Sequence, residues 1–301
     1  MTSYIFPADP LGGRSWTVDS HFQQEYTHAA SLAPVALLDS YSLDGKVRLQ
    51  LPEGFSSPVV YRGWMLSADE YRALHSALAE RGFEMLTDPE SYIQVHSMDG
   101  WVERFPGLTP ATVILPATVS EEELLEAAGS LPNEHGYFLK GTVKSEPGFS
   151  RAETAEELPG LLERFREFSG IADAGKIALR SFVPLDSTVA ELRTWWIDGY
   201  LSLIDVHPNF SEMGLEHPLD GYRLEDSAID FTAKLAPKLK ELSNRFLTAD
   251  MALTAAGDWI LVELGDGQVS GLPESYNTDE VLYSYERFEG EFAEMAKARQ
   301  S

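Results

Sequence analysis

The sequence contains no cysteine. A disulfide framework, a thiolate metal site and a cysteine nucleophile are therefore all excluded. A chain without disulfides fits a reducing compartment, and the stretch from Met1 to Pro10 lacks the basic region and apolar run of a secretory signal. We therefore expect a cytoplasmic protein.

Long apolar runs and positive charge are also scarce. No apolar stretch approaches the roughly 20 residues of a membrane span, so no membrane segment is expected. Lysine and arginine number 23 against 48 aspartate and glutamate residues, which gives a formal net charge of −25. Such a charge repels nucleic acid, so a nucleic-acid partner is not expected. It also repels nucleotides, and any nucleotide site must gather its cations locally.

What the sequence does contain is an alternation of strand and helix patterns. With 301 residues, of which 44% are hydrophobic, the chain is long enough for two or three packed subdomains. Residues 59–65 read as a buried strand, and Ser67 with Glu70 forms a capping box that opens a helix. These patterns favour an α/β layer in roughly the first hundred residues. The Pro-containing stretch 105–116 is the best boundary, and Asp198-Gly199 marks a hairpin in the α+β remainder.

The most informative segment runs from Asp250 to Glu263. A hairpin turn centred on Ala256-Gly257 pairs Thr254 with Trp259, and the same register pairs Asp250 with Glu263. Directly opposed side chains lie about 5 Å apart at their Cβ atoms. The segment therefore predicts two neighbouring carboxylates on otherwise apolar strands.

Two opposed carboxylates repel each other unless a cation neutralises them. Mg²⁺ takes hard oxygen ligands, often one or two carboxylates together with phosphates, so the pair predicts a magnesium site. Three alternatives stay open at this point: solvated acids on an exposed sheet face, an aspartic-type dyad and a glycosidase pair.

Several cations also lie in strand patterns. Lys140 and Lys144 share one face of a predicted strand, and Arg180 and Arg193 lie in two further strands. Each alone is more often a solvated surface charge. Their concentration on strands of an acidic protein favours phosphate contacts. Histidine offers no comparable signal, because His207 is followed by proline and is interpreted as a loop residue.

In this order, the residues resemble the ATP-grasp superfamily, in particular the divergent clade named for two arginines and a lysine. The resemblance covers about residues 55 to 273. Its elements are Arg62 in Tyr-Arg-Gly-Trp-Met, Lys140 and Lys144, Arg180 in Leu-Arg-Ser-Phe-Val-Pro-Leu, Arg193 after Glu-Leu, Asp250, and Glu263 in Val-Glu-Leu-Gly-Asp-Gly-Gln.

The resemblance implies an ATP-grasp fold of mixed α/β and α+β class. Residues 1–110 would form an N-terminal α/β pre-ATP-grasp subdomain, and residues 111–301 the ATP-grasp domain. Its two lobes, about 111–185 and 186–301, would clasp ATP between them.

The resemblance also implies a role for each site residue. Lys140 and Lys144 would contact the nucleotide and its phosphates, and the strand from Arg180 through Phe182 to Val183 would meet the adenine. The remaining implied roles are Mg²⁺ ligation by Asp250 and Glu263, and binding of the phosphates or an acyl phosphate by the catalytic residues Arg193 and Arg62.

One position departs from the family pattern. Many ATP-grasp enzymes have Glu-x-Asn at the second metal strand, but Gly265 stands at the asparagine position. Asp266 as a metal ligand, or Gln268 as a cofactor contact, is then expected to substitute.

The implied activity is an ADP-forming carboxylate ligase. A small-molecule or peptide carboxylate would attack ATP with Mg²⁺ present, and an amine, thiol or hydroxyl would displace phosphate from the acyl phosphate. One alternative is a non-catalytic, nucleotide-binding regulatory protein of the same fold. Another is a Mg²⁺-dependent phosphohydrolase that forms no amide.

Overall fold

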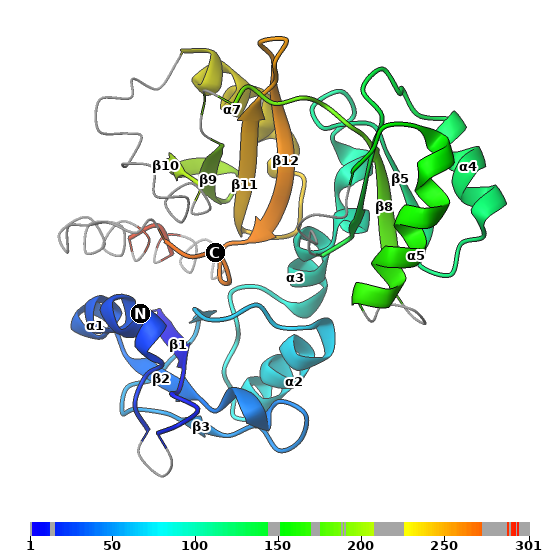
Figure 1. The fold of residues 1–301 in the computed structure, drawn as a ribbon. Coiled ribbons are helices and arrows are strands. Elements are labelled where there is room, and N and C mark those ends of the chain that lie inside the picture. The colour runs from blue at the N-terminus through cyan, green and yellow to red at the C-terminus, as the bar shows by residue number, and fades with distance from the viewer. Residues whose placement is uncertain are drawn as a thin grey trace.

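The computed structural model describes residues 2–12, 16–143, 151–169, 175–187, 189, 191–207, 226–272, 288, 290–292 and 294. Within this part of the chain lie three four-stranded sheets, in the orders β3-β2-β1-β4, β5-β8-β6-β7 and β10-β9-β11-β12. Figure 1 shows them as three bodies around a common centre, with the N-terminal sheet below and the other two above it.

The N-terminal sheet has a parallel core. Its strands are β1 (Ser3–Pro7), β2 (Val35–Leu38), β3 (Leu49–Gln50) and β4 (Val59–Tyr61), and β3 alone is antiparallel to its neighbour. Its helices are α1 (Gln23–Leu32), α2 (Ala68–Ala79) and α3 (Pro89–His96). The predicted capping box at the start of α2 is confirmed: Ser67 accepts from the Glu70 backbone, and Glu70 accepts from the Ser67 backbone.

The second sheet is antiparallel. It consists of β5 (Thr112–Pro116), β6 (Tyr137–Gly141), β7 (Arg151–Ala152) and β8 (Lys176–Ser181). Helices α4 (Glu121–Gly129) and α5 (Leu158–Ser169) cover one face, as Figure 1 shows. Leu124, Leu139 and Leu161 fill the core between the sheet and these helices. This sheet with its helices is called the first lobe below.

The third sheet, also antiparallel, is called the second lobe with its helix. Its strands are β9 (Leu192–Ile197), β10 (Tyr200–Val206), β11 (Phe246–Leu253) and β12 (Trp259–Asp266). Helix α7 (Asp226–Leu239) packs against its apolar face through Phe231 and Leu235. Asp198 and Gly199 both have positive φ, which confirms the predicted hairpin turn between β9 and β10.

The packing partner of the chain changes before the expected boundary. Val95, Trp101 and Phe105, which follow or end α3, are buried in the core of the second lobe. The expected boundary stretch 105–116 itself contains β5. Short 3-10 helices complete the described elements at Ser20–Phe22, Ser40–Ser42, Met98–Gly100, Val102–Arg104 and Ala155–Glu157.

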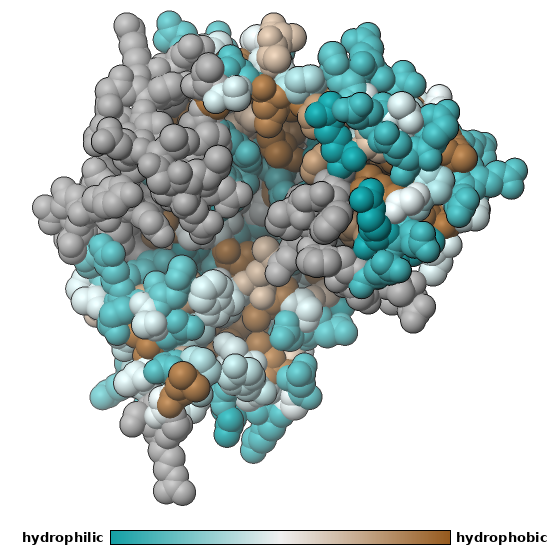
Figure 2. Space-filling view, viewed as in Figure 1, coloured by the Kyte–Doolittle hydropathy of each residue, from teal (hydrophilic) through white to brown (hydrophobic). Residues whose placement is uncertain are grey.

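The surface is mixed in character. Figure 2 shows polar and apolar residues interspersed, with a hollow where the second-lobe sheet meets the other two bodies. None of the helices in the described ranges has both the length and the apolar character that crossing a bilayer demands.

Candidate active site

A row of charged side chains crosses the second-lobe sheet. Arg193 on β9 is in register with Asp205 on β10 and with Asp250 on β11, and Asp250 is in register with Glu263 on β12. Paired residues of an antiparallel sheet project from the same face. The row therefore places three carboxylates and one guanidinium on one face, opposite the face that α7 covers.

Asp250 is held by the arginine of the row. Arg193 donates from Nε to Oδ1 and from Nη2 to Oδ2 of Asp250, each at 2.8 Å. Burial alone would raise the pKa of Asp250, but the hydrogen bonds and charge of Arg193, followed by those of His207, lower it to about 2. Asp250 is therefore ionised at neutral pH although it is only 6% exposed.

Glu263 has a partner in the first lobe. Lys140 on β6 reaches across to it, with 2.9 Å between Nζ and Oε2, and is itself only 3% exposed. Together, the two ion pairs show how the sheet tolerates opposed carboxylates: each acid already has its own cation. Repulsion between Asp250 and Glu263 is thus relieved by protein groups. Lys144, which was expected to join Lys140, lies outside the described residues.

The hairpin between β11 and β12 confirms one expected pair and corrects the other. Asp250 does face Glu263, but Trp259 faces Leu253 instead of Thr254. The loop is one residue longer than expected at its base, because the Thr254 amide bonds the Asp258 carbonyl at 2.8 Å across residues 255–257. The register then shifts by one between Met251 and Asp250, and this bulge restores the predicted carboxylate pair.

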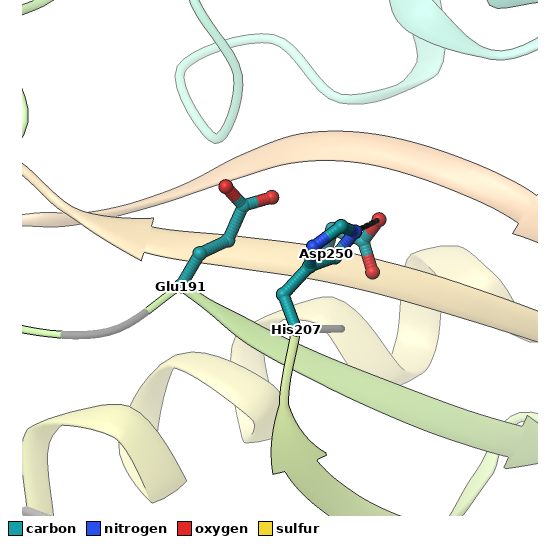
Figure 3. Close-up of side chains that lie close together, drawn as sticks. All are labelled: Glu191, His207 and Asp250. Carbon is teal, nitrogen blue, oxygen red and sulfur yellow. Dashed lines mark ion pairs between the residues drawn. The ribbon is translucent and has the colours of Figure 1, made fainter. Parts of the chain in front are cut away.

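Two residues of the site were not predicted, Glu191 and His207. Figure 3 shows their side chains gathered beside Asp250, and one ligand atom from each of the three lies within 4.8 Å of the others. His207 Nε2 is 2.7 Å from Arg193 Nη2 and 3.4 Å from Asp250 Oδ2. Burial raises the pKa of Glu191 to about 7, with Asp250 adding to the rise and His207 opposing it.

The sequence carried a signal for only one of the two. Glu191 lies two positions before Arg193, so the strand period places both on one face. His207 reaches the site because its amide bonds the Glu191 carbonyl at 2.8 Å. A bulge at Ser202, between the pairs Leu201–Trp196 and Leu203–Trp195, sets that pairing, and hairpin arithmetic from the turn does not include it.

The predicted adenine strand occupies the hinge between the lobes. The side chain of Phe182 lies under the guanidinium of Arg151, 4.2 Å from the ring centroid. Val183 lines a cavity of about 800 Å³ together with the β11–β12 loop and α7. The side chain of Arg180 turns toward β12, where its Nη1 donates to the Val262 carbonyl at 3.1 Å.

Asp266 and Gln268 belong to a different group of residues. The Asp266 carboxylate accepts hydrogen bonds from the Gln268 amide at 2.8 Å, from the Gln268 side chain and from Asn244. Gln268 also bonds the Tyr71 hydroxyl and the Tyr61 amide of the N-terminal body. The structure thus does not bring Asp266 to Asp250 and Glu263, and we leave it out of the metal set.

Arg62 lies at the same junction and not with Arg193. It is 3% exposed and donates to the carbonyls of Gly267 and Ser270 and to the carboxylate of Glu25. These bonds tie the end of β4 to the segment that follows β12. The expected phosphate or acyl-phosphate role of Arg62 is therefore replaced by a structural one.

The donors of the charged row fit Mg²⁺. Two carboxylates from adjacent strands offer hard oxygen ligands on one face, and the row has three acids for one arginine. Lys140 and Arg193 bring cations of the kind that bind phosphate to the same place. The geometry suits a metal-nucleotide complex lying between the lobes.

Comparison with known proteins places the chain in one family. The matching family is an ATP-grasp domain, family 3 of the clade named for two arginines and a lysine, and the match covers residues 98–285. A search of curated protein sequences finds no match.

Solved structures agree on the fold. The crystal structure of the D-cycloserine synthetase DcsG has a TM-score of 0.59 at 12% identity, covering 95% of this chain and 98% of that one. The D-alanine-D-alanine ligase of Coxiella burnetii has a TM-score of 0.59 at 10% identity, with 99% and 98% covered. The ATP-grasp ligase PsnB, complexed with its precursor peptide PsnA2 and AMPPNP, has a TM-score of 0.54 at 13% identity, with 95% and 98% covered.

Proposed function

The chain belongs to this third family of the divergent ATP-grasp clade, and on that premise we propose that it is a Mg²⁺-dependent, ADP-forming ligase. It activates a carboxylate with ATP and joins the acyl group to an amine, thiol or hydroxyl. One observation carries the proposal: Asp250 and Glu263 face each other across β11 and β12, and each is bound to a buried cation.

The two ion pairs explain how the site accepts its ligands. In the structure, Lys140 neutralises Glu263 where a metal ion does so in the loaded site, and Glu263 takes the place of a phosphate oxygen at Lys140. Binding of Mg²⁺ and ATP exchanges these partners without leaving either charge unpaired. Arg193 and Asp250 stand in the same relation. An exchange of this kind avoids the cost of burying an isolated charge.

The residues then perform charge neutralisation and alignment. When bound, Mg²⁺ withdraws charge from the phosphate oxygens. Lys140 and Arg193 neutralise the phosphates and fix the γ-phosphorus for attack by a carboxylate oxygen of the substrate. ADP leaves, and the product is an acyl phosphate. A nucleophile then attacks the acyl carbon, and inorganic phosphate leaves with the electron pair of the broken C–O bond.

The structurally similar proteins support an amine as the nucleophile. Their titles name a D-alanine-D-alanine ligase and a ligase with its precursor peptide. We therefore propose formation of a C–N bond with an amino-acid or peptide substrate.

Trapping with hydroxylamine tests this function without knowledge of the natural acceptor. The purified protein is incubated with ATP, Mg²⁺, hydroxylamine and pools of amino acids and small peptides, and hydroxamate and ADP are measured together. Equimolar hydroxamate and ADP in one pool support the ligase. Phosphate release without hydroxamate indicates a phosphohydrolase, and nucleotide binding without turnover indicates a regulatory protein. Either result would refute the proposal.

A further inference from the structure

The pairing of Asp250 with Glu263 depends on one extra residue in β12. From the loop inward, the pairs are Leu253 with Trp259, Ala252 with Ile260, and Met251 with Leu261. The next pair is Asp250 with Glu263, so Val262 has no partner on β11. Val262 is therefore the inserted residue of a β-bulge.

Without the bulge, the second carboxylate would leave the site. Continuing the register of the loop end would pair Asp250 with Val262 and Ala249 with Glu263. Ala249 is fully buried in the core under α7, so a one-residue slip would direct the Glu263 carboxylate into that core. The metal pair thus requires that the bulge be held in place.

The outer edge of β12 is bonded at the bulge. The Leu261 amide donates to the Leu108 carbonyl at 2.7 Å, and the Leu261 carbonyl accepts from Thr109 Oγ1 at 2.8 Å. The carbonyl of the inserted Val262 accepts from Arg180 Nη1 at 3.1 Å. A bulge leaves ladder groups unpaired, and these contacts satisfy them from the first-lobe side.

Arg180 is fixed for this task by two threonines. Its Nη2 donates to Thr109 Oγ1 at 2.7 Å and its Nε to Thr112 Oγ1 at 3.1 Å. Each of its three nitrogens is thus bonded to protein, and the residue is only 5% exposed. Its guanidinium also acts through charge on Glu263.

We infer that Arg180 is a positioning residue that clamps the Val262 bulge and thereby places Glu263 opposite Asp250. This inference rests on the proposed function, in which those two carboxylates bind Mg²⁺. It replaces the expectation that Arg180 belongs to a strand that contacts adenine. Arg180 acts through the backbone of β12 and touches neither nucleotide nor metal.

The test compares Arg180→Met, Arg180→Lys and Thr109→Val with the wild type. Calorimetry measures the affinity for AMP-PNP with and without Mg²⁺. In Arg180→Met, the Mg²⁺-dependent gain in affinity is expected to fall by roughly tenfold or more, because a charged hydrogen bond is lost. The affinity without Mg²⁺ stays at the wild-type value. Lysine restores part of the gain, because its ammonium reaches the Val262 carbonyl but lacks the fork that binds both threonines.

Arg166 provides the matched control. It donates from Nε to the Ala117 carbonyl at 2.7 Å and from Nη2 to the Val119 carbonyl at 2.6 Å, in the same lobe but away from β12. Arg166→Met is expected to lower thermal stability while keeping the full Mg²⁺-dependent gain. An equal loss of that gain in Arg166→Met would make the effect one of general stability and overturn the inference.

A crystal structure of Arg180→Met without ligands separates this inference from the proposed function. A β12 in which Val262 is no longer bulged supports the inference, even if the wild type shows no Mg²⁺-dependent gain and the proposed function fails. An intact bulge with Glu263 opposite Asp250 overturns the inference whatever the binding data show. If Arg180→Met does not fold, Thr109→Val and Arg180→Lys are judged by the same two criteria.

Discussion

Asp250 and Asp266 lie in neighbouring strands of one sheet, and both are buried, yet their environments are opposite. Asp250 meets Arg193 and His207, whose hydrogen bonds and charges outweigh burial and lower its pKa to about 2. Asp266 meets mainly neutral amides, so burial dominates and raises its pKa to about 6, although the bonds from Asn244 and Gln268 oppose the rise. Burial alone therefore does not decide the state of an acid; the charge of its partner does.

The two arginines that the family resemblance singled out divide in the same way. Arg193 binds a carboxylate of the charged row, where ligands can exchange with it. Arg62 binds two backbone carbonyls and Glu25, and these bonds fasten the N-terminal body to the segment after β12. One group of buried charges is thus arranged for ligands and the other for assembly.

The largest expected effect comes from removing the charge of Asp250. In Asp250→Asn, Mg²⁺-dependent ADP formation should fall at least about 100-fold, because the metal supplies several kcal/mol of charge stabilisation. Without metal, the variant should also lose roughly 3 kcal/mol of unfolding free energy, since Arg193 is left buried with an incomplete partner. Asp266→Asn is the control and should keep Mg²⁺-dependent AMP-PNP binding. Equal losses of binding in both variants would abolish the distinction between the two aspartates.

Asp266 should show its environment in the pH dependence of stability. Its folded-state pKa of about 6 lies above the ordinary value of 3.8, so the folded protein holds this proton more tightly than the unfolded chain. The stabilisation is complete below pH 3.8, is lost as pH rises through about 6, and amounts to at most about 3 kcal/mol. Urea unfolding between pH 4 and 7 should therefore show a steeper decline for the wild type than for Asp266→Asn. Parallel curves would mean that Asp266 ionises normally.

Lys140 should matter for nucleotide binding more than for folding. Lys140→Met should weaken AMP-PNP binding by roughly 1.5–3 kcal/mol, the value of a hydrogen bond to a charged group. Glu263, which is 37% exposed at its side chain, remains accessible to solvent when its partner is removed. Arg245→Met offers a comparison, because that arginine pairs with Asp198 at the β9–β10 turn. Unchanged AMP-PNP affinity in Lys140→Met would remove Lys140 from the phosphate site.

The sequence predicted the parts of the fold that depend on local signals. The Ser67 and Ser120 capping boxes and the Asp198-Gly199 turn are all present, because each rests on residues a few positions apart. The roles of Arg62 and Asp266 depend on which body packs against which, and no local pattern carries that information.

Bulges mark the limit of hairpin arithmetic in this site. Both edge strands of the second lobe contain one, at Ser202 in β10 and at Val262 in β12. Each shifts the pairing by one residue and turns an acid, Asp205 or Glu263, into the charged row. Turn residues set the register only up to the first inserted residue, so the predicted pairing of Thr254 with Trp259 was wrong while the carboxylate pair was right.

The smallest expected effect concerns Gly265, where many ATP-grasp enzymes carry asparagine. A Cβ built at this position would lie 2.9 Å from Thr248 Oγ1 and 3.4 Å from Ser270 Oγ, and these two hydroxyls bond each other at 2.9 Å. The pair of hydroxyls therefore occupies the space of the missing side chain. Gly265→Ala should destabilise the protein by about 1 kcal/mol through overpacking, and Thr248→Ala in the same chain should relieve part of that cost.

A double-mutant cycle measured by urea unfolding decides the point. Favourable coupling between Gly265→Ala and Thr248→Ala shows that the two positions compete for one space, whereas additive effects show that they do not. Mg²⁺-dependent AMP-PNP binding should be the same in Gly265→Ala and the wild type, because the contact lies on the assembly side of the comparison. A loss of Mg²⁺ affinity in Gly265→Ala would instead extend the metal site along β12 toward Ser270.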